Sequence, residues 1–262
     1  MKRIVALIIA IAMAFVFSAC ANPSGENQPD KKYVQDKGVL IVGITDFAPM
    51  DFRGDDGGWI GFDAEMSKAF AEYLGVEVKF VEIEWDNKIF ELDSKSIDCV
   101  WNGMTLTDEV QKAMECSNAY CKNAQVVVVP ASEADKYKDK DSLSALTFAV
   151  ESGSAGEKAA VEANFNRVAV QSQSVALMEV AAGTSDACII DLLMAGAMIG
   201  EGTSYTNLTY TVALNSEEYG VGFRKGSDLV KELNKFFAEA YADGLMMETA
   251  KAYGVQESII AQ

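Results

Sequence analysis

The sequence of 262 residues contains no histidine. Histidine is the commonest general base and metal ligand near neutral pH, so its absence excludes Ser-His-Asp and Cys-His catalysis. The five cysteines show no spacing typical of a zinc site. We therefore expect no metal, no cofactor and no catalytic residues, which means that the protein is not an enzyme.

Positive charge is also scarce. The chain has 22 Lys and Arg against 39 Asp and Glu, and its net charge is −17. A surface with this charge argues against nucleic acid or anionic lipid as a partner. Half of the residues are hydrophobic, so the chain has enough apolar material for one large domain or two modest ones.

Only the N-terminus carries a long hydrophobic run. Lys2-Arg3 precedes the apolar segment 4–17, which has the length of a signal-peptide core and is too short to span a bilayer well. Residues 1–20 end in Ser-Ala-Cys and resemble a bacterial lipoprotein signal, in which Cys20 is acylated (palmitate). The alternative is an ordinary cleaved signal with a chance cysteine. Residues 21–32 are polar and predict a flexible tether. Together they predict a lipid-anchored protein on the extracytoplasmic face of the cell membrane.

Four cysteines remain beyond the signal. Cys99 and Cys188 lie in apolar, strand-like runs, which predicts buried thiols. Cys116 and Cys121 are close in the sequence, and an exported protein permits a disulfide between them. The sequence leaves open whether they pair.

The first part of the chain alternates strand and helix patterns. We expect a buried strand at 39–42, a helix from Gly61 to Leu74, a strand at 76–80, a helix at 85–92 and a strand at 97–101. This order is typical of a sheet covered by helices. Amphipathic helices at 228–241 and 245–253 need a sheet to cover, and the first lobe is the candidate.

A second series of the same kind begins at residue 146 and runs to residue 214. The β-branched run 124–129 and the segment 219–224 read as the two places where the chain crosses between series. The sequence therefore predicts an α/β protein of two lobes joined by a two-strand hinge. The first lobe is expected at 33–125 and 214–262, and the second at 126–213. Such proteins close around a ligand.

Polar residues follow the strands at three places. Segment 98–110 predicts a strand, a turn at Asn102-Gly103 and a capped helix. Segment 148–158 repeats this pattern, and segment 186–191 ends a buried strand with a carboxylate. Strand ends of open α/β sheets bind ligands, so these three predict one cleft.

Several motifs then occur in order: Val42-Gly43, Phe47-Ala-Pro-Met50, Gly61-Phe-Asp63, Gly103-Met-Thr-Leu-Thr107, Asp186-Ala to Asp191, and Glu218-Tyr-Gly-Val-Gly-Phe-Arg-Lys225. As a set they resemble the solute-binding proteins, family 3, of polar amino acid ABC importers, across nearly the whole mature chain. The resemblance implies the periplasmic-binding-protein type II fold and a monomer that hands an amino acid to permease and ATPase subunits.

The resemblance also implies roles for particular residues. Two aromatic side chains sandwich the ligand, although core packing is the alternative for each. The lobe-one strand end, the second-lobe helix N-terminus and an acid that grips the α-ammonium group complete the site. The implied ligand-binding residues are Phe47, Trp85, Asn102, Gly103, Thr105, Glu151, Ser154, Ala155 and Asp191.

One position departs from the family pattern. The main carboxylate anchor of the family is an arginine in the helix after Thr107, and this chain has Val110 there. Valine cannot replace a bidentate guanidinium. Either backbone N–H groups carry the carboxylate, or the ligand lacks one. Glu151 with Asp46, Glu84 and Asp191 would make an acidic cleft that favours a cationic ligand, unless these acids merely reflect the overall charge.

We therefore expect an extracytoplasmic binding lipoprotein that delivers a polar or cationic amino acid to a permease. One alternative is a binder of another small amine or polar solute. A second is a dehydratase-like enzyme on the same fold, and a third is a sensory or adhesive lipoprotein. The sequence does not disclose the ligand or its affinity.

Overall fold

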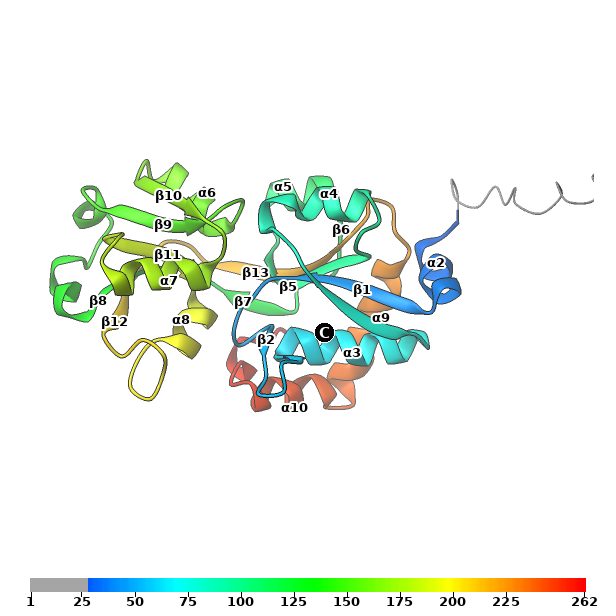
Figure 1. The fold of residues 1–262 in the computed structure, drawn as a ribbon. Helices are drawn as coiled ribbons and strands as arrows, with labels where there is room; N and C mark the ends of the chain where they lie inside the picture. The colour runs from blue at the N-terminus through cyan, green and yellow to red at the C-terminus, as the bar shows by residue number, and fades with distance from the viewer. Residues whose placement is uncertain (1–27) are drawn as a thin grey trace, which may run out of the picture.

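The computed structural model describes residues 28–262, and it consists of two α/β lobes side by side (Figure 1). Each lobe is built on its own mixed β-sheet, as the alternation of strand and helix patterns predicts. The predicted signal peptide and most of the predicted tether, with Cys20, lie outside the described residues. Within residues 28–262, no helix is long and apolar enough to cross a membrane.

The first lobe is built on a sheet in the order β4-β1-β5-β13-β6, with β7 also paired to β13. Strands β1, β4 and β5 are parallel, whereas β13 is antiparallel to β5. The strands are β1 (Val39–Ile44), β4 (Glu77–Glu82), β5 (Cys99–Thr105), β6 (Glu115–Cys116), β7 (Cys121–Asn123) and β13 (Glu217–Phe223). A small hairpin, β2 (Phe52–Arg53) and β3 (Trp59–Ile60), stands apart from this sheet.

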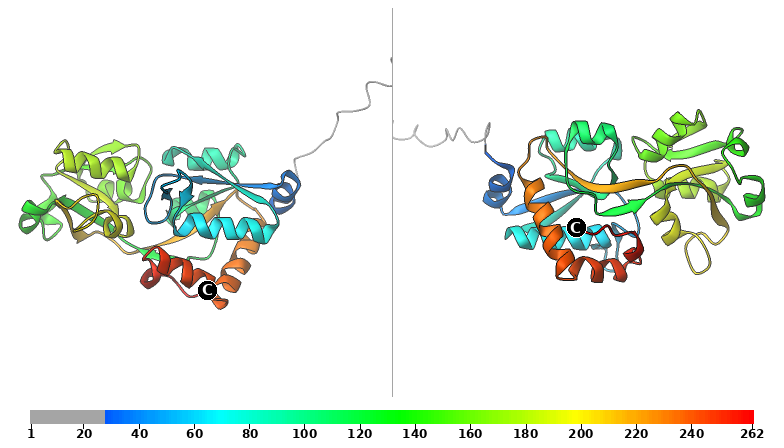
Figure 2. Two further views of the ribbon diagram at one scale, coloured as in Figure 1. Left: turned by 60° about the horizontal axis from the view of Figure 1, so that its bottom comes forward. Right: turned by 180° about the vertical axis from the view of Figure 1, so that it is seen from behind.

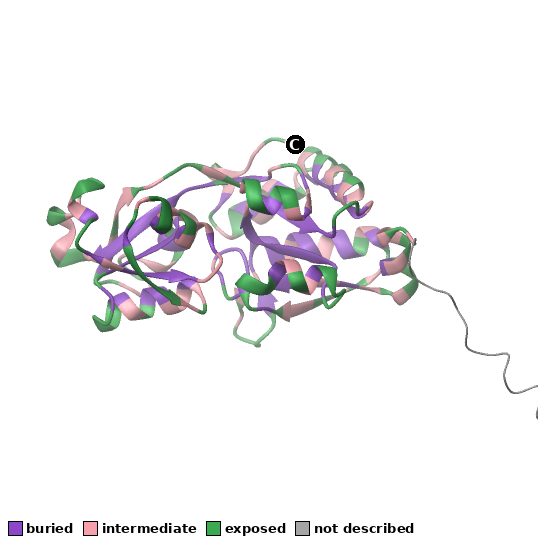
Figure 3. Ribbon diagram, turned by 90° about the horizontal axis from the view of Figure 1, so that it is seen from above, coloured by how far each residue is buried: buried purple, intermediate pink, exposed green. Residues whose placement is uncertain are grey.

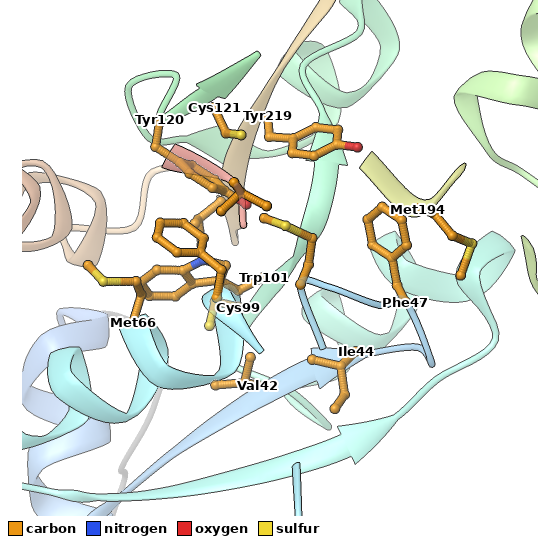
Figure 4. Packing of buried hydrophobic residues seen from close by; sticks show 14 of the residues in the cluster. Val42, Ile44, Phe47, Met66, Cys99, Trp101, Tyr120, Cys121, Met194 and Tyr219 are labelled. Atoms are coloured by element: carbon orange, nitrogen blue, oxygen red, sulfur yellow. The ribbon is translucent and has the colours of Figure 1, made fainter. Parts of the chain in front are cut away.

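Helices from both ends of the chain cover the first sheet. They are α2 (Asp30–Lys37), α3 (Phe62–Leu74), η1 (Trp85–Asn87), α4 (Lys88–Asp93), α5 (Asp108–Ala113), α9 (Leu229–Ala242), α10 (Leu245–Ala252) and η4 (Gln256–Ser258). Phe236 and Phe237 of α9 are buried, and Phe237 packs edge-on against Trp101 of β5 at a centroid distance of 5.5 Å. The expectation that the terminal helices cover the first lobe is therefore confirmed. Figure 4 shows Trp101 with Tyr120 and Tyr219 in this core.

The second lobe is built on a sheet in the order β10-β9-β11-β8-β12. Strands β9, β10 and β11 are parallel and β8 is antiparallel to β11. Burial is concentrated along the sheets of both lobes (Figure 3). The elements are β8 (Gln125–Pro130), η2 (Ala131–Lys136), η3 (Asp141–Leu143), β9 (Thr147–Glu151), α6 (Ala155–Glu162), β10 (Asn166–Val170), α7 (Gln173–Ala182), β11 (Ala187–Asp191), α8 (Leu192–Met198) and β12 (Leu208–Ala213).

The chain passes between the two sheets twice, first between β7 and β8 and then between β12 and β13. The two connections are bonded to each other. The Leu214 N–H donates to the Gln125 carbonyl at 2.8 Å, and the Gln125 N–H donates to the Asn215 side chain at 2.7 Å. Figure 2 shows both segments from behind. The sequence had placed the crossings within 124–129 and 219–224, but β8 and β13 each belong to one sheet and only the short connections cross.

Strand β5 differs from its expected course. The sequence predicts a glycine turn at Asn102-Gly103, whereas the strand continues through both residues to Thr105. Gly103 has a φ of 54°, and the pairing of β5 with β13 shifts register nearby. A backbone irregularity inside a strand accommodates the glycine, so no turn forms. Helix α5 does begin at Asp108 as expected, because the Thr107 hydroxyl accepts from the Val110 N–H.

All four cysteines within the described residues are free thiols. Cys99 and Cys188 are fully buried, as their apolar surroundings in the sequence predict. Burial raises the pKa of both thiols above its ordinary value, so they stay protonated. Cys116 and Cys121 do not bridge in this structure: each lies on a separate short strand paired with β13.

Candidate ligand-binding site

A cavity of about 420 Å³ is lined by residues of both lobes. This volume lies in the range of sites for small molecules. All nine residues that the sequence singles out for ligand binding line this one cavity. From the first lobe they are Phe47, Trp85, Asn102, Gly103 and Thr105, and from the second lobe Glu151, Ser154, Ala155 and Asp191.

Two aromatic side chains form apolar walls on the first-lobe side. Phe47 is 3% exposed, and its ring meets that of Tyr219 edge-on at a centroid distance of 6.3 Å. Trp85 is 8% exposed and packs in an apolar cluster with Met104 and Val110. Both rings therefore combine core contacts with a surface in the cavity, so neither packing nor ligand contact excludes the other.

The end of β5 is held in place by buried acids. The Asn102 amide donates to Asp51 at 2.8 Å, and its oxygen accepts from the Thr45 N–H and hydroxyl. The Gly103 N–H donates to Asp63 at 2.6 Å. A Cβ at Gly103 would lie 2.3 Å from the Phe47 ring, so only glycine allows the ring to approach this closely. These groups shape the cavity wall.

The Thr105 hydroxyl is also engaged within the protein. It donates to Glu217 of β13 at 2.8 Å. Thr105 is one of the residues expected to bind the ligand, and it does line the cavity. Its hydroxyl also belongs to a polar cluster beside the connections between the lobes.

The second lobe presents the N-terminus of α6 to the cavity. Ser154 caps the helix, because its hydroxyl accepts from the Glu157 N–H at 3.1 Å, and Ala155 is the first helical residue. The first N–H groups of a helix lack intrahelical partners, and the helix dipole favours negative charge there. The geometry suits an anionic group such as a carboxylate.

Asp191 ends β11 and is 4% exposed. Its carboxylate accepts from Tyr219 at 2.6 Å and Gln125 at 3.0 Å, and also from the side chains of Asn123 and Gln173. Burial, followed by the nearby Glu217, raises the pKa of Asp191 to about 8. Four neutral donors and no cation surround this acid among the described residues, so a ligand ammonium group would supply the missing charge.

Glu151 ends β9 and is 3% exposed. One of its carboxylate oxygens, Oε1, has no hydrogen-bond partner in the described structure. Burial, followed by the neighbouring Asp191, raises the pKa of Glu151 to about 8. Buried polar atoms are nearly always satisfied, so an orphaned oxygen on a cavity wall points to a ligand donor.

Two polar residues of the cavity lining and one residue behind it had no role in the sequence analysis. Lys88 and Gln173 line the cavity, and Tyr219 binds Asp191 from behind. Nothing in the sequence marks Lys88, because a lysine in a short helix is normally solvated. Gln173 follows the cap residue Ser172, and only the tertiary structure brings its amide to Asp191.

The cavity lining carries more negative than positive charge. Its acids are Asp46, Asp86, Glu109, Glu151, Glu157 and Asp191, and its bases are Lys88, Lys158 and Arg167. Glu84 was also expected in the acidic cleft, but it does not line the cavity. Its carboxylate accepts a hydrogen bond of 2.8 Å from the Gln171 side chain across the cleft. Val110 also lines the cavity at the position where the family pattern has arginine. Among residues 28–262 no cluster of acids and cysteines is arranged to hold a metal ion.

The lobes touch at the cavity mouth. The Lys88 ammonium donates to the Gly153 carbonyl at 3.0 Å. Gly153 has a φ of 70°, and a Cβ there would lie 2.6 Å from Oδ1 of Asp86. With the Glu84–Gln171 bond, these contacts hold the two walls of the cleft together.

The sequence over residues 40–256 matches the model of the bacterial extracellular solute-binding proteins, family 3. The chain therefore belongs to this family of solute-binding proteins. Its two-lobed fold is the type II fold of the periplasmic amino-acid-binding proteins, which confirms the fold expected from the ordered motifs.

Two known proteins illustrate the range of the family. The chain is 31% identical over 228 residues to the L-cystine-binding protein TcyJ of Escherichia coli, covering 84% of each chain. It is 25% identical over 195 residues to a cyclohexadienyl dehydratase of Pseudomonas aeruginosa, covering 72% of each. Enzymes thus occur among its more distant relatives.

Solved structures agree with the sequence comparison. One mutant of ArgBP from T. maritima has a TM-score of 0.81 and 29% identity, covering 86% of this chain and 99% of that one. Another mutant of ArgBP has been solved with arginine bound. An ABC uptake transporter substrate-binding protein from Streptococcus pneumoniae with bound histidine has a TM-score of 0.77 and 30% identity, covering 86% and 96%.

Proposed function

We propose that this protein captures a polar or cationic amino acid between its lobes and delivers it to the permease of an ABC importer. The observation that carries the proposal is the pair of buried acids, Asp191 and Glu151, in a cavity with aromatic walls from the other lobe. Relatives that bind cystine, arginine or histidine support the ligand class.

Each wall of the cavity has a role in this proposal. Phe47 and Trp85 pack against the ligand, and Asn102, Gly103 and Thr105 shape the first-lobe wall. Asp191 binds the α-ammonium group, since its other partners are all neutral. Ser154 and Ala155 place the α6 N-terminus beside the ligand. The excess of acids, with Glu151 among them, favours a ligand side chain that carries positive charge or several donors.

The lobes are proposed to divide at the two connections, with 33–125 and 214–262 on one side and 126–213 on the other. The contact of Lys88 with Gly153 joins the two lobes across the cleft and is available to break when the cleft opens. A ligand that touches both lobes would favour the closed form in proportion to its extra contacts there.

The N-terminus is proposed to anchor a monomer to the outer face of the cell membrane through acylated Cys20. The tether expected at 21–32 is proposed to end before Asp30, because α2 begins there. Permease and ATPase subunits would then meet the closed protein at the membrane. Cys20→Ser should abolish labelling with a clickable palmitate analogue and release the protein into the soluble fraction. Retention of label and membrane attachment by this variant would rule out Cys20 as the anchor.

Ligand binding is tested directly by calorimetry of the mature protein with the common amino acids. We expect at least one of cystine, arginine and histidine to bind, and a bound ligand to raise the unfolding temperature by mass action. Asp191→Asn keeps the side-chain shape but removes the charge and should lower affinity by about tenfold to a hundredfold. A shift with small amines but with no amino acid would favour the alternative solute.

An enzymatic function is the second candidate. The raised pKa values of Glu151 and Asp191 are typical of carboxylic acids that exchange protons near neutral pH, and a dehydratase is a relative. Incubation of the mature protein with cyclohexadienyl compounds, followed by detection of the dehydrated product, distinguishes turnover from simple binding.

A further inference from the structure

Lys88 is a buried cation in the cleft that pairs with no acid. It is 7% exposed and begins α4 on the first-lobe side of the cavity. Its Nζ donates to the carbonyl oxygens of Trp85 at 3.1 Å and Gly153 at 3.0 Å. Among the salt bridges of residues 28–262, none involves Lys88.

An ammonium group has three N–H donors, and main-chain carbonyls take two of those on Lys88. The third has no partner among the described residues. A buried charge is unfavourable unless an opposite charge lies close to it. Burial lowers the pKa of Lys88, and the acids Glu151, Asp86 and Glu109 oppose this from beyond salt-bridge distance. An anion in the cavity would complete the environment of this ammonium group.

Val110 cannot bind that anion itself. It lines the same cavity as Lys88 and packs in one apolar cluster with Trp85, whose carbonyl Lys88 binds. A valine side chain has no hydrogen-bond donor, so position 110 supplies none to this wall of the cavity. Lys88 is the only cavity-lining Lys or Arg under 10% exposed within the described structure, since Lys158 and Arg167 are partly solvated and pair with Glu162 and Glu157.

The two buried acids of the cavity lie on the opposite lobe from Lys88. Glu151 and Asp191 belong to the second lobe, and Lys88 belongs to the first. A molecule with both charges would therefore contact a cation on one lobe and acids on the other. Such a molecule gains its full electrostatic interaction only when the cleft is closed.

We propose that the Lys88 Nζ binds the carboxylate of a zwitterionic ligand and so takes the place of a guanidinium at position 110. This inference rests on the proposed function as an amino-acid-binding protein. The alternative is that Lys88 only stabilises the contact between the lobes, through its hydrogen bond to the Gly153 carbonyl.

The experiment compares ligands with and without the carboxylate. Binding of L-arginine, L-argininamide, L-cystine and L-cystine dimethyl ester is measured by calorimetry for the mature wild type and for Lys88→Met, Lys88→Arg and Lys158→Met. A charged hydrogen bond lost from a closed site should weaken binding of the carboxylate ligand by about tenfold to a hundredfold. We expect Lys88→Met to show this loss for the free acid and almost none for its amide or ester.

The other two variants serve as matched controls. Lys88→Arg should retain the preference for the carboxylate, because a guanidinium keeps the charge and the donors. Lys158→Met removes a cation from the same cavity but from its solvated edge, and should change the preference by less than about threefold.

Different outcomes separate the inference from the proposed function. If Lys88→Met lowers the affinity for the free acid and for its amide equally, Lys88 acts only as a structural contact between the lobes, and the inference is overturned. The inference would also be overturned if Lys88→Met kept the wild-type preference for the carboxylate over the amide, or if Lys158→Met lost this preference to the same extent as Lys88→Met. A wild-type protein that binds none of the common amino acids would overturn the proposed function, and this inference with it.

Discussion

The Tyr219 hydroxyl donates a hydrogen bond of 2.6 Å to Oδ1 of Asp191. Tyr219 belongs to the first-lobe sheet and Asp191 to the second, so this bond joins the lobes at the bottom of the cleft. Asn123 and Gln125, which flank the connection from β7 to β8, donate to the same oxygen. The acid proposed to hold the ligand ammonium is therefore oriented by the residues on which the lobes would turn.

Tyr219→Phe removes one donor from this buried carboxylate. We expect unfolding free energy to fall by about 1–3 kcal/mol. The Tyr219 bond also opposes the rise in the pKa of Asp191, so the variant holds this acid protonated to higher pH. Ligand affinity at pH 7 should fall about threefold to tenfold. Chemical denaturation and calorimetry measure the two effects.

Tyr120→Phe is the matched control for that variant. Tyr120 is equally buried and donates to Asp63 at 2.7 Å, but Asp63, unlike Asp191, does not line the cavity. It should lose similar stability and keep its ligand affinity. Equal affinity losses in both variants would show that the Tyr219 effect is a general consequence of destabilisation.

Gly153→Ala tests the close approach of the lobes. The added Cβ would lie 2.6 Å from Oδ1 and 2.9 Å from Cα of Asp86 across the cleft. Because the backbone atom cannot move aside easily, the closed form should become less stable and ligand affinity should fall by about tenfold or more. Small-angle scattering with saturating ligand should give a larger radius of gyration than for the wild type.

Gly183→Ala controls for the backbone strain in that experiment. Its φ of 74° is close to the 70° of Gly153, but nothing lies within 4 Å of the added Cβ. Both alanines should destabilise the fold by about 1–2 kcal/mol, because a Cβ is unfavourable at a left-handed φ. Only the Gly153 variant should bind weakly, and a similar affinity loss at Gly183 would argue against a steric effect on closure.

The raised pKa of Glu151 makes both the free energy of unfolding and ligand affinity depend on pH. Its pKa rises from an ordinary value of 4.5 to about 8, with Asp191 facing it from β11, Lys88 from α4 and Glu84 from beside η1. Between these values the native protein binds more protons than the unfolded chain. The free energy of unfolding without ligand should therefore fall as pH rises from about 5 to about 8. Glu151→Gln should flatten part of this fall, and the rest belongs to the other buried acids with raised pKa values, Asp191, Asp63 and Asp51.

A cationic ligand reverses this effect at the site. Its positive charge lowers the pKa of Glu151, so binding below pH 8 releases a proton. Affinity should rise with pH up to about 8, by at most about tenfold per unit for this group. Calorimetry in buffers of different ionisation enthalpy counts the protons released. A pH-independent affinity in the wild type would contradict the proposed contact with Glu151.

Phe237→Ala tests how the C-terminal helix supports the first lobe. Phe237 is 1% exposed and packs against Trp101 and Tyr120. Its removal leaves a cavity in the core and should lower the free energy of unfolding by about 3–5 kcal/mol. Phe90→Ala, at a side chain that is 69% exposed, should cost less than about 0.5 kcal/mol. Urea denaturation measures both.

Most helices and strands of this fold can be predicted from local patterns of apolar, polar and glycine residues in the sequence. The apolar run at 39–42 predicts β1, and helical spacing with Gly75 at its end predicts α3, since Gly75 caps that helix with a φ of 74°. The face of Leu229, Leu233, Phe236 and Phe237 predicts a buried stripe on α9. Strand ends with polar residues predict one cleft, and the nine selected residues do line one cavity.

The sequence alone determined the order of helices and strands, the absence of histidine chemistry and the positions of polar strand ends, because each depends on neighbouring residues. Only the tertiary structure decided that β5 continues through Gly103, that Thr105 binds Glu217, and that Lys88 is buried without an acid beside it. The bond between Thr105 and Glu217, for example, joins residues 112 positions apart. Pairing and burial at such distances arise when the sheets assemble, and no local pattern encodes them.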